Sequence, residues 1–165
     1  MALFWVNQGR TYQQEREGGY VWSPQVSRRG GKVRGFSNMC DIHRGDYIFH
    51  NSKASIQAVS IAKTDCYDAN QPRELLDAGG KNDWNQEGYR VDLEYHDLDT
   101  SVPMAPFRLW LMEHHVEKSA FDRRGQSHQQ YMSHLNEMQA QYLLQHVIKQ
   151  QRTEEVRTFL RRVLP

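Results

Sequence analysis

The chain has 165 residues, 38% of them hydrophobic and 25% charged, and a formal net charge of +1. This length suits one domain with its own core, and the 4 Trp, 8 Tyr and 6 Phe argue against a disordered chain. Apolar runs stay well short of the roughly 18 residues that cross a membrane, so we expect no membrane partner.

Charge is distributed unevenly along the chain. Residues 1–64 carry a net charge of +5, residues 65–122 carry −8 and residues 123–165 carry +4. A fold that keeps these segments apart would present a basic face to a polyanion, whereas a fold that interleaves them would have a mixed surface. The sequence leaves both arrangements open.

The first two thirds of the chain are typical of short strands separated by turns. Alternation, aromatic and β-branched content, and Gly or Pro at the boundaries predict strands over Phe4–Asn7, Tyr20–Ser23, Tyr47–His50, Ser55–Lys63 and Tyr89–Tyr95. Helical turns ended by glycine are predicted over Thr11–Gly18 and Pro72–Asp77. Trp5 is expected in the core, and Arg28–Arg34 forms a basic loop.

The last third changes to a helical period. Ser127 and Gln130 fit a capping box that would start one helix, and Thr153 would cap a final helix. Asp122–Gln126 is predicted as a loop. Because strands come first and helices last, the pattern indicates an α+β fold. An earlier helix is marked by an apolar stripe of Phe107, Trp110, Leu111 and His114.

Neither the histidines nor the carboxylates form a recognisable catalytic pattern. The 8 histidines lack the i, i+4 spacing of a zinc-binding helix, and the 2 cysteines form no CxxC pair. Asp92 and Glu94 resemble the start of a nuclease motif, but Tyr95 and His96 stand where its lysine would follow. We therefore expect no enzyme activity, metal or cofactor in this chain, and reduced thiols in a cytoplasmic protein.

Two tryptophans stand at predicted strand boundaries among small polar groups. Trp22 precedes Ser23 and Pro24, and Trp84 lies in the polar loop 82–88. Each would either fill the core or serve as a platform for a flat base, since base–aromatic stacking contributes roughly 1–3 kcal/mol. Polar neighbours would then read the edge of a base flipped out of a helix.

Four segments, in this order over residues 3–96, resemble EVE domains, which are PUA-like and related to YTH domains. They are FWVNQGRTYQQEREGGYVWSPQ, GDYIFH, IQAVSIAKTDCYDANQP and WNQEGYRVDLEY. The later segment GQSHQQYMSHL is similar to the variety at the N-terminus of modification-dependent restriction proteins, often ahead of an HNH nuclease. The resemblance implies one domain over residues 1–165, as the N-terminal part of a longer restriction protein. Its fold would be a β-barrel-like sheet flanked by helices, with a helical C-terminal part.

The resemblance also implies a pocket that takes a modified base. The residues that match it are Trp22 and Trp84 as aromatic walls, Tyr67 as a further wall candidate, and Asn7, Gln8 and Ser23 as polar neighbours. DNA phosphates would be contacted by basic residues of two segments, namely Arg28, Arg29, Lys32, Arg34, Arg123 and Arg124.

The implied function is binding of double-stranded DNA with 5-methyl- or 5-hydroxymethylcytosine by base flipping, as the specificity module of a restriction system in bacterial defence. A reader of N6-methyladenine or of modified RNA stays open, because contacts to the 2′-OH leave no readable pattern. A third alternative is a protein-interaction module that packs its last helix, Thr153–Leu164, on another chain.

Overall fold

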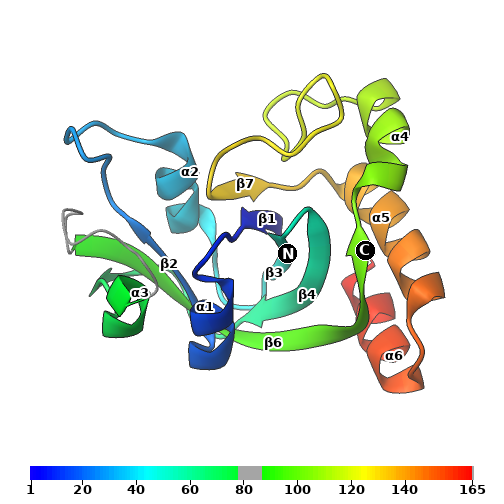
Figure 1. The fold of residues 1–165 in the computed structure, drawn as a ribbon, viewed down its shortest axis with the longest axis horizontal. Coiled ribbons are helices and arrows are strands. Elements are labelled where there is room, and N and C mark those ends of the chain that lie inside the picture. The colour runs from blue at the N-terminus through cyan, green and yellow to red at the C-terminus, as the bar shows by residue number, and fades with distance from the viewer. Residues whose placement is uncertain (78–86, 165) are drawn as a thin grey trace.

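The computed structural model describes residues 1–77 and 87–164, and it confirms the predicted α+β fold (Figure 1). Within these residues, seven strands form one curled sheet in the order β2–β6–β4–β3–β1–β7, with β5 beside β6. Strands β1 and β3 pair in parallel, and the other pairs are antiparallel. The strands are β1 (Leu3–Asn7), β2 (Tyr20–Pro24), β3 (Tyr47–Ser52), β4 (Ser55–Ala62), β5 (Tyr67–Asn70), β6 (Glu87–Pro103) and β7 (Met132–His134).

Strand β6 is long enough to serve two parts of the sheet. Residues 88–92 pair with β2, and residues 93–97 and 102–103 pair with β4. The register of β4 with β6 shifts between Ile56 and Ala58, where the pairing is interrupted. The predicted strand Tyr89–Tyr95 is thus only the first part of a 17-residue strand that joins β2 to β4.

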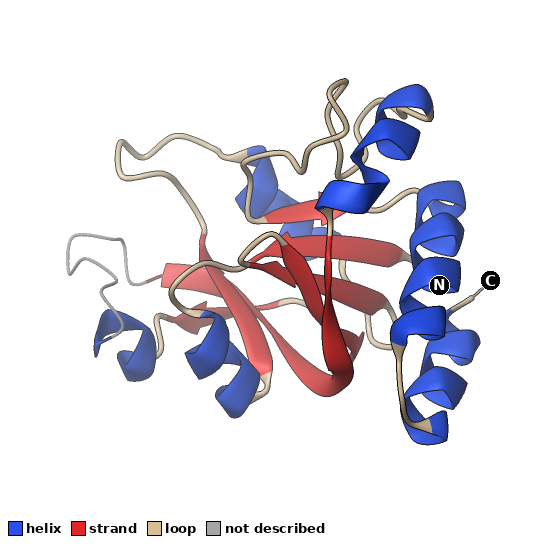
Figure 2. Ribbon diagram, turned by 45° about the vertical axis from the view of Figure 1, so that its right-hand side comes forward, coloured by secondary structure: helices blue, strands red, loops and turns tan. Residues whose placement is uncertain are grey.

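The helices gather at the two ends of the sheet. Figures 1 and 2 show α4, α5 and α6 together at one end, while α1 and α3 lie near β2 at the other. None of the described helices is long and apolar enough to cross a membrane. They are α1 (Tyr12–Gly18), α2 (Arg34–Ser37), α3 (Arg73–Asp77), α4 (Arg108–Glu113), α5 (Glu137–Gln150) and α6 (Glu154–Val163), with 3-10 turns η1 (Asn38–Asp41) and η2 (Ala105–Phe107).

Strand β1 is buried on both faces. Trp5 points to the helical side, where its ring centroid lies 5.0 Å from that of Phe121. Phe4 and Val6 point to the opposite face and belong to a second apolar cluster. The expectation that Trp5 belongs to the core is confirmed, since its side chain is fully buried.

The last helix uses its apolar face inside the chain. Thr153 caps α6 as predicted, because its side chain accepts a hydrogen bond from the Val156 amide. The buried residues Phe159, Leu160 and Val163 belong to the main core cluster. That face is therefore already covered by the chain itself and is not left open for another protein.

The helix predicted to start at Ser127 is wrong in its first turns. Residues 127–131 form a loop, β7 follows, and α5 begins only after Asn136, whose side chain accepts from the Gln139 amide. Strand β7 completes the open edge of β1, whose backbone groups would otherwise lack partners. Long-range strand pairing has overridden a local capping pattern.

The predicted loop Asp122–Gln126 packs tightly against α4. Gly125 has φ +71°, and a Cβ there would lie 2.1 Å from the Arg108 carbonyl oxygen. Gly30 also has positive φ, but a Cβ there would meet nothing within 4 Å. A side chain at Gly30 would therefore cause backbone strain alone, whereas one at Gly125 would cause backbone strain and a steric clash.

We predict that Gly30→Ala costs about 1 kcal/mol, the usual penalty of a left-handed alanine. Gly125→Ala should cost on the order of 3 kcal/mol, because the clash adds to that penalty. Urea unfolding of both variants measures the difference. Equal losses would contradict the close packing of this loop on α4.

Candidate nucleic-acid interface

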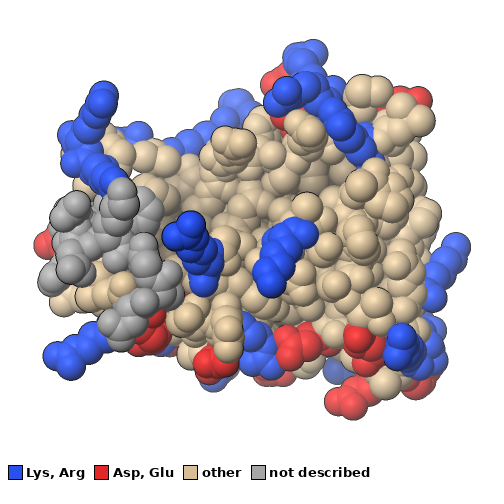
Figure 3. Space-filling model, in the orientation of Figure 1, with Lys and Arg blue, Asp and Glu red and all other residues tan. Residues whose placement is uncertain are grey.

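A cavity of about 630 Å³ opens on one face of the molecule, within the size range of small-molecule sites. The loops after β1 and β3, the end of β2, α2, α3 and the segment 127–131 all contribute to it. Figure 3 shows the hollow in the middle of a largely uncharged face. Its lining is Asn7, Gly9, Thr11, Trp22, Pro24, Phe36, Asn51, Ala54, Gln71, Leu75, Ser127, His128, Gln129, Gln130 and Tyr131.

Trp22 contributes to the cavity wall but is firmly held. Its indole N–H donates to the Ala69 carbonyl oxygen at 2.9 Å, and only 4% of the residue is exposed. Gly88 lies so close that a Cβ there would stand 2.2 Å from the indole ring. Strand pairing and Gly88 thus fix this ring in one orientation. Trp84, the second predicted wall, lies outside the described residues.

The structure places three predicted pocket residues outside the cavity lining. Ser23 follows Trp22 on β2, and neighbouring positions of a strand point to opposite faces. Gln8 lies just beyond β1, where Glu15 and His50 hold its side chain. Gln8 turns into the buried interior, and the Ser23 hydroxyl donates to the Pro24 carbonyl oxygen. Tyr67 is 40% exposed on β5.

Asn7 lines the cavity, yet its amide is already fully occupied. Its Nδ2 donates to the carbonyl oxygens of His128 at 2.7 Å and Gln130 at 2.9 Å. Its Oδ1 accepts from Trp5 Nε1, Asn51 Nδ2 and Ser127 Oγ. Asn7 therefore fastens the segment 127–131 to the sheet, which differs from the predicted role of reading a base edge.

Segment 127–131 supplies a wall that sequence reasoning missed. The polar run of this segment was the available signal, but its helical spacing pointed elsewhere. Asn51 and Gln71 were also missed. In the described part of the chain, Asn51 Oδ1 and Gln71 Oε1 are buried without a hydrogen-bond partner, and both residues line the cavity.

A buried carboxylate supports this wall from beneath. Glu15, fully buried on α1, accepts hydrogen bonds from the Trp22 amide at 3.1 Å and from the Tyr131 hydroxyl. Its other oxygen accepts from Gln8 Nε2 at 2.9 Å and Thr11 Oγ1 at 3.2 Å. Because Trp22, Thr11 and Tyr131 line the cavity, one carboxylate holds three of its residues.

Burial dominates the protonation of this network. It raises the pKa of Glu15 from 4.5 to about 7, while hydrogen bonds led by that from Tyr131 lower it. His50 Nδ1 lies 2.6 Å from Gln8 Oε1, and burial lowers the pKa of His50 to about 3. Of the two ionisable groups Glu15 and His50, it is therefore Glu15 that titrates around neutral pH.

We predict that Glu15 makes the folded state less stable as pH rises. Its raised folded-state pKa gives a contribution that is fully present below pH 4.5 and lost on passing pH 7. The loss amounts to roughly 3 kcal/mol, since one pKa unit corresponds to about 1.4 kcal/mol. Glu15→Gln removes the titrating group, so this part of the pH dependence should vanish.

Urea unfolding of both proteins between pH 4 and pH 8 measures this effect. The quantity to compare is the slope of unfolding free energy with pH, because Glu15→Gln also changes the absolute stability by rearranging hydrogen bonds. Parallel slopes in the two proteins would contradict the assignment.

The predicted basic residues divide between two places beside the cavity. Arg34 joins Arg123 and Arg124 in a second cleft of about 590 Å³, which shares His128 and Gln130 with the cavity. Arg28 and Arg29 line a shallow depression that shares Phe36 with the cavity, and Lys32 is exposed in the same loop. Figure 3 shows blue side chains around the hollow and acidic ones along the lower edge.

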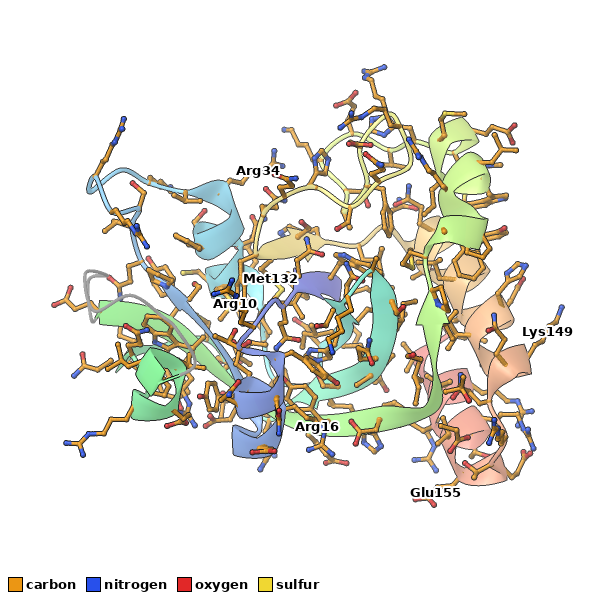
Figure 4. The ribbon with its side chains drawn as sticks, viewed as in Figure 1. Arg10, Arg16, Arg34, Met132, Lys149 and Glu155 are labelled. Carbon is orange, nitrogen blue, oxygen red and sulfur yellow. The ribbon has the colours of Figure 1, made fainter. Side chains whose placement is uncertain are left out.

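The picture adds one cation that the sequence did not single out. Arg10 follows the cavity-lining Gly9 and lies over the middle of this face in Figure 4. The described residues contain no group of three or more His, Cys, Asp or Glu that could hold a metal ion. The chemistry on this face is therefore that of aromatic and amide groups surrounded by cations.

Comparison with known proteins gives a likeness of structure only. No protein-family model and no curated protein matches the chain. A hypothetical protein from Leishmania major matches with a TM-score of 0.58 at 14% identity, over 92% of this chain and 98% of that one. Human THYN1, in complex with DNA containing 5-methylcytosine, matches with a TM-score of 0.53 at 9% identity, over 89% and 98%.

An ASCH protein from Zymomonas mobilis has a similar fold as well. It matches with a TM-score of 0.52 at 6% identity, over 87% of this chain and 94% of that one. These likenesses show a shared fold and do not single out the EVE type found in restriction proteins. The chain has a PUA-like α+β fold, with a curled sheet and C-terminal helices.

Proposed function

We propose that this chain reads a modified base in DNA by taking one flipped base into the cavity. The observation that carries the proposal is a cavity with room for a base, walled by Trp22 and Tyr131, that adjoins a cleft lined with arginines. A flat base needs an aromatic wall, and the strand that carries it needs cations nearby. The 5-methylcytosine DNA bound to THYN1 supports this choice of ligand.

Two unpaired oxygens of wall residues lie buried behind the cavity surface, and we propose that a bound base with an amino group draws them toward it. Asn51 Oδ1 and Gln71 Oε1 accept hydrogen bonds, and buried acceptors without partners cost free energy. Cytosine offers its N4 amino group, and adenine its N6 amino group, whereas thymine presents an acceptor at the same place. 5-Methyl- and 5-hydroxymethylcytosine keep that amino group and are our first choice, with N6-methyladenine as the alternative.

The proposed reader has no cutting activity of its own. The predicted nuclease pair Asp92 and Glu94 lies on β6, where Asp92 accepts hydrogen bonds from Tyr67 and Arg90 and Glu94 contacts His96. Both carboxylates are thus engaged in contacts on the sheet. We propose that cleavage, in a restriction system, comes from a separate or fused nuclease.

Four duplexes that differ at one position test the proposal. That position holds cytosine, 5-methylcytosine, uracil or thymine, each opposite an abasic site so that flipping costs are similar. We predict the tightest binding for 5-methylcytosine, at least about tenfold tighter than cytosine, measured by fluorescence anisotropy. All four should stay intact with Mg²⁺ or Mn²⁺ present.

The four bases test separately whether the chain recognises the methyl group and whether it recognises the amino group. Equal affinity for cytosine and 5-methylcytosine, repeated with hydroxymethylcytosine and methyladenine, would overturn the proposed function. Equal affinity for thymine and 5-methylcytosine would leave methyl reading intact and remove the amino-group argument. Matched RNA strands test the RNA alternative in the same assay.

Gly9 allows the cavity to be blocked without disturbing the core. It lines the cavity, and a Cβ there would meet nothing within 4 Å. Trp22→Ala is a poorer test, because truncating a buried tryptophan costs roughly 3–5 kcal/mol of stability. Gly9 is therefore the cleaner position for a variant.

We predict that Gly9→Trp abolishes the preference for 5-methylcytosine, because the added ring occupies the space of the base. Salt-dependent binding to any duplex should remain, and the thermal midpoint should stay near that of wild type. Gly9→Ala is the matched control and should keep the preference. A folded Gly9→Trp protein that still prefers the modified duplex would place the base elsewhere.

A further inference from the structure

The second cleft has a surplus of positive charge that the chain does not neutralise. Among its lining residues, Arg123 pairs with Glu117, and Arg124 lies 3.4 Å from Asp122. His115 and Arg123 hold the pKa of Glu117 below its usual range, so this carboxylate is ionised at neutral pH. These pairs leave two cations of the cleft, which come from distant parts of the sequence.

Arg34 and Lys118 are those two cations. Arg34 begins α2, and Lys118 lies in the turn that follows α4, 84 positions later in the sequence. Both are exposed, and within the described chain neither side chain forms an ion pair. These two cations are suited to an anion that the chain itself does not supply.

The backbone at Lys118 supports a role in binding. Its φ is +63°, a left-handed conformation that costs a lysine roughly 1 kcal/mol relative to glycine. The next residue, Ser119, is buried, donates to Gln139 Oε1 at 2.7 Å and accepts from the Asn136 amide. The turn is thus held in a strained form that keeps an unpaired lysine in the cleft, and such strain is typical of functional sites.

The cleft and the base cavity are neighbours. His128 and Gln130 line both, so a strand whose base enters the cavity has the cleft within reach. In Figure 4 Arg34 lies on the upper part of this face, whereas Lys149 lies on α5 at the far right. The base and the phosphate of one nucleotide are linked through a single sugar. One nucleotide can therefore place its base in the cavity and its phosphate in the cleft.

We infer that the cleft of Arg34 and Lys118 binds a phosphodiester that flanks the flipped nucleotide. The inference rests on the proposed function and adds a second subsite to it. Base entry and phosphate binding would then support each other, because the same nucleotide makes both contacts. The loop with Arg28 and Arg29 would contact other phosphates.

Neutral phosphates locate this contact. A methylphosphonate removes one charge, and it is placed in turn on the 5′ side of the 5-methylcytosine, on its 3′ side, and several nucleotides away. We predict that one flanking position weakens binding to wild type about tenfold, in keeping with a hydrogen bond to a charged group. Lys118→Gly should lose a similar factor on the normal duplex and respond to that substitution by less than about twofold.

Lys118→Gly is chosen because glycine suits a left-handed backbone, so its thermal midpoint should equal or exceed that of wild type. Arg34→Ala should show the same insensitivity and flatten the salt dependence by about one unit of slope. Lys149→Ala, which removes an exposed charge on α5, is the control and should behave as wild type.

Two results would overturn the inference. One is a preference for 5-methylcytosine that persists while every methylphosphonate weakens wild type and Lys118→Gly by the same factor. The other is the same difference between wild type and Lys118→Gly, in their response to the methylphosphonate, on a duplex without 5-methylcytosine. That result would make the cleft a general contact to the DNA backbone. Loss of the preference in wild type would instead remove the proposed function itself.

Discussion

The hydrogen bonds of Asn7 are the constraint on which the rest of this face depends. One amide at the end of β1 holds the carbonyl oxygens of His128 and Gln130, and accepts from Asn51 and Ser127. Residues 127–131 have no regular structure of their own, so these bonds and the pairing of β7 with β1 set their position. Because the segment forms a wall of both the cavity and the cleft, its position decides whether either exists.

A second constraint works from beneath the cavity and is electrostatic. Glu15 accepts hydrogen bonds from the Trp22 amide and the Tyr131 hydroxyl, so two walls of the cavity are held by one carboxylate. Burying this group is costly in its ionised form, which is why its pKa moves to about 7. Apolar packing alone would hold these two aromatic residues less specifically than the two directional hydrogen bonds that they donate to Glu15.

The proposed function combines two contributions that differ in range. Stacking on Trp22 and Tyr131 acts only on a base already inside the cavity and would return part of the cost of flipping. The cations act on any duplex and bring it to this face before a base enters. Arg34 and Lys118 would contribute to the attraction of DNA and also to base entry, because they would bind the strand at the nucleotide that is flipped.

The sequence by itself determined five of the seven described strands, the α+β order, the core position of Trp5 and the cap at Thr153, because alternation, turn residues and capping act over a few residues. It also pointed to Trp22 and to Arg34, Arg123 and Arg124. Which residues meet was decided by the tertiary structure. Ser23 leaves the cavity because it faces the other side of β2 from Trp22, and Gln8 leaves it because Glu15 and His50 hold its side chain in the interior. Segment 127–131 became a wall rather than a helix because the edge of β1 needed a partner strand. Lys118 and Arg34 line one cleft only in the folded chain, because no local sequence pattern connects residues so far apart.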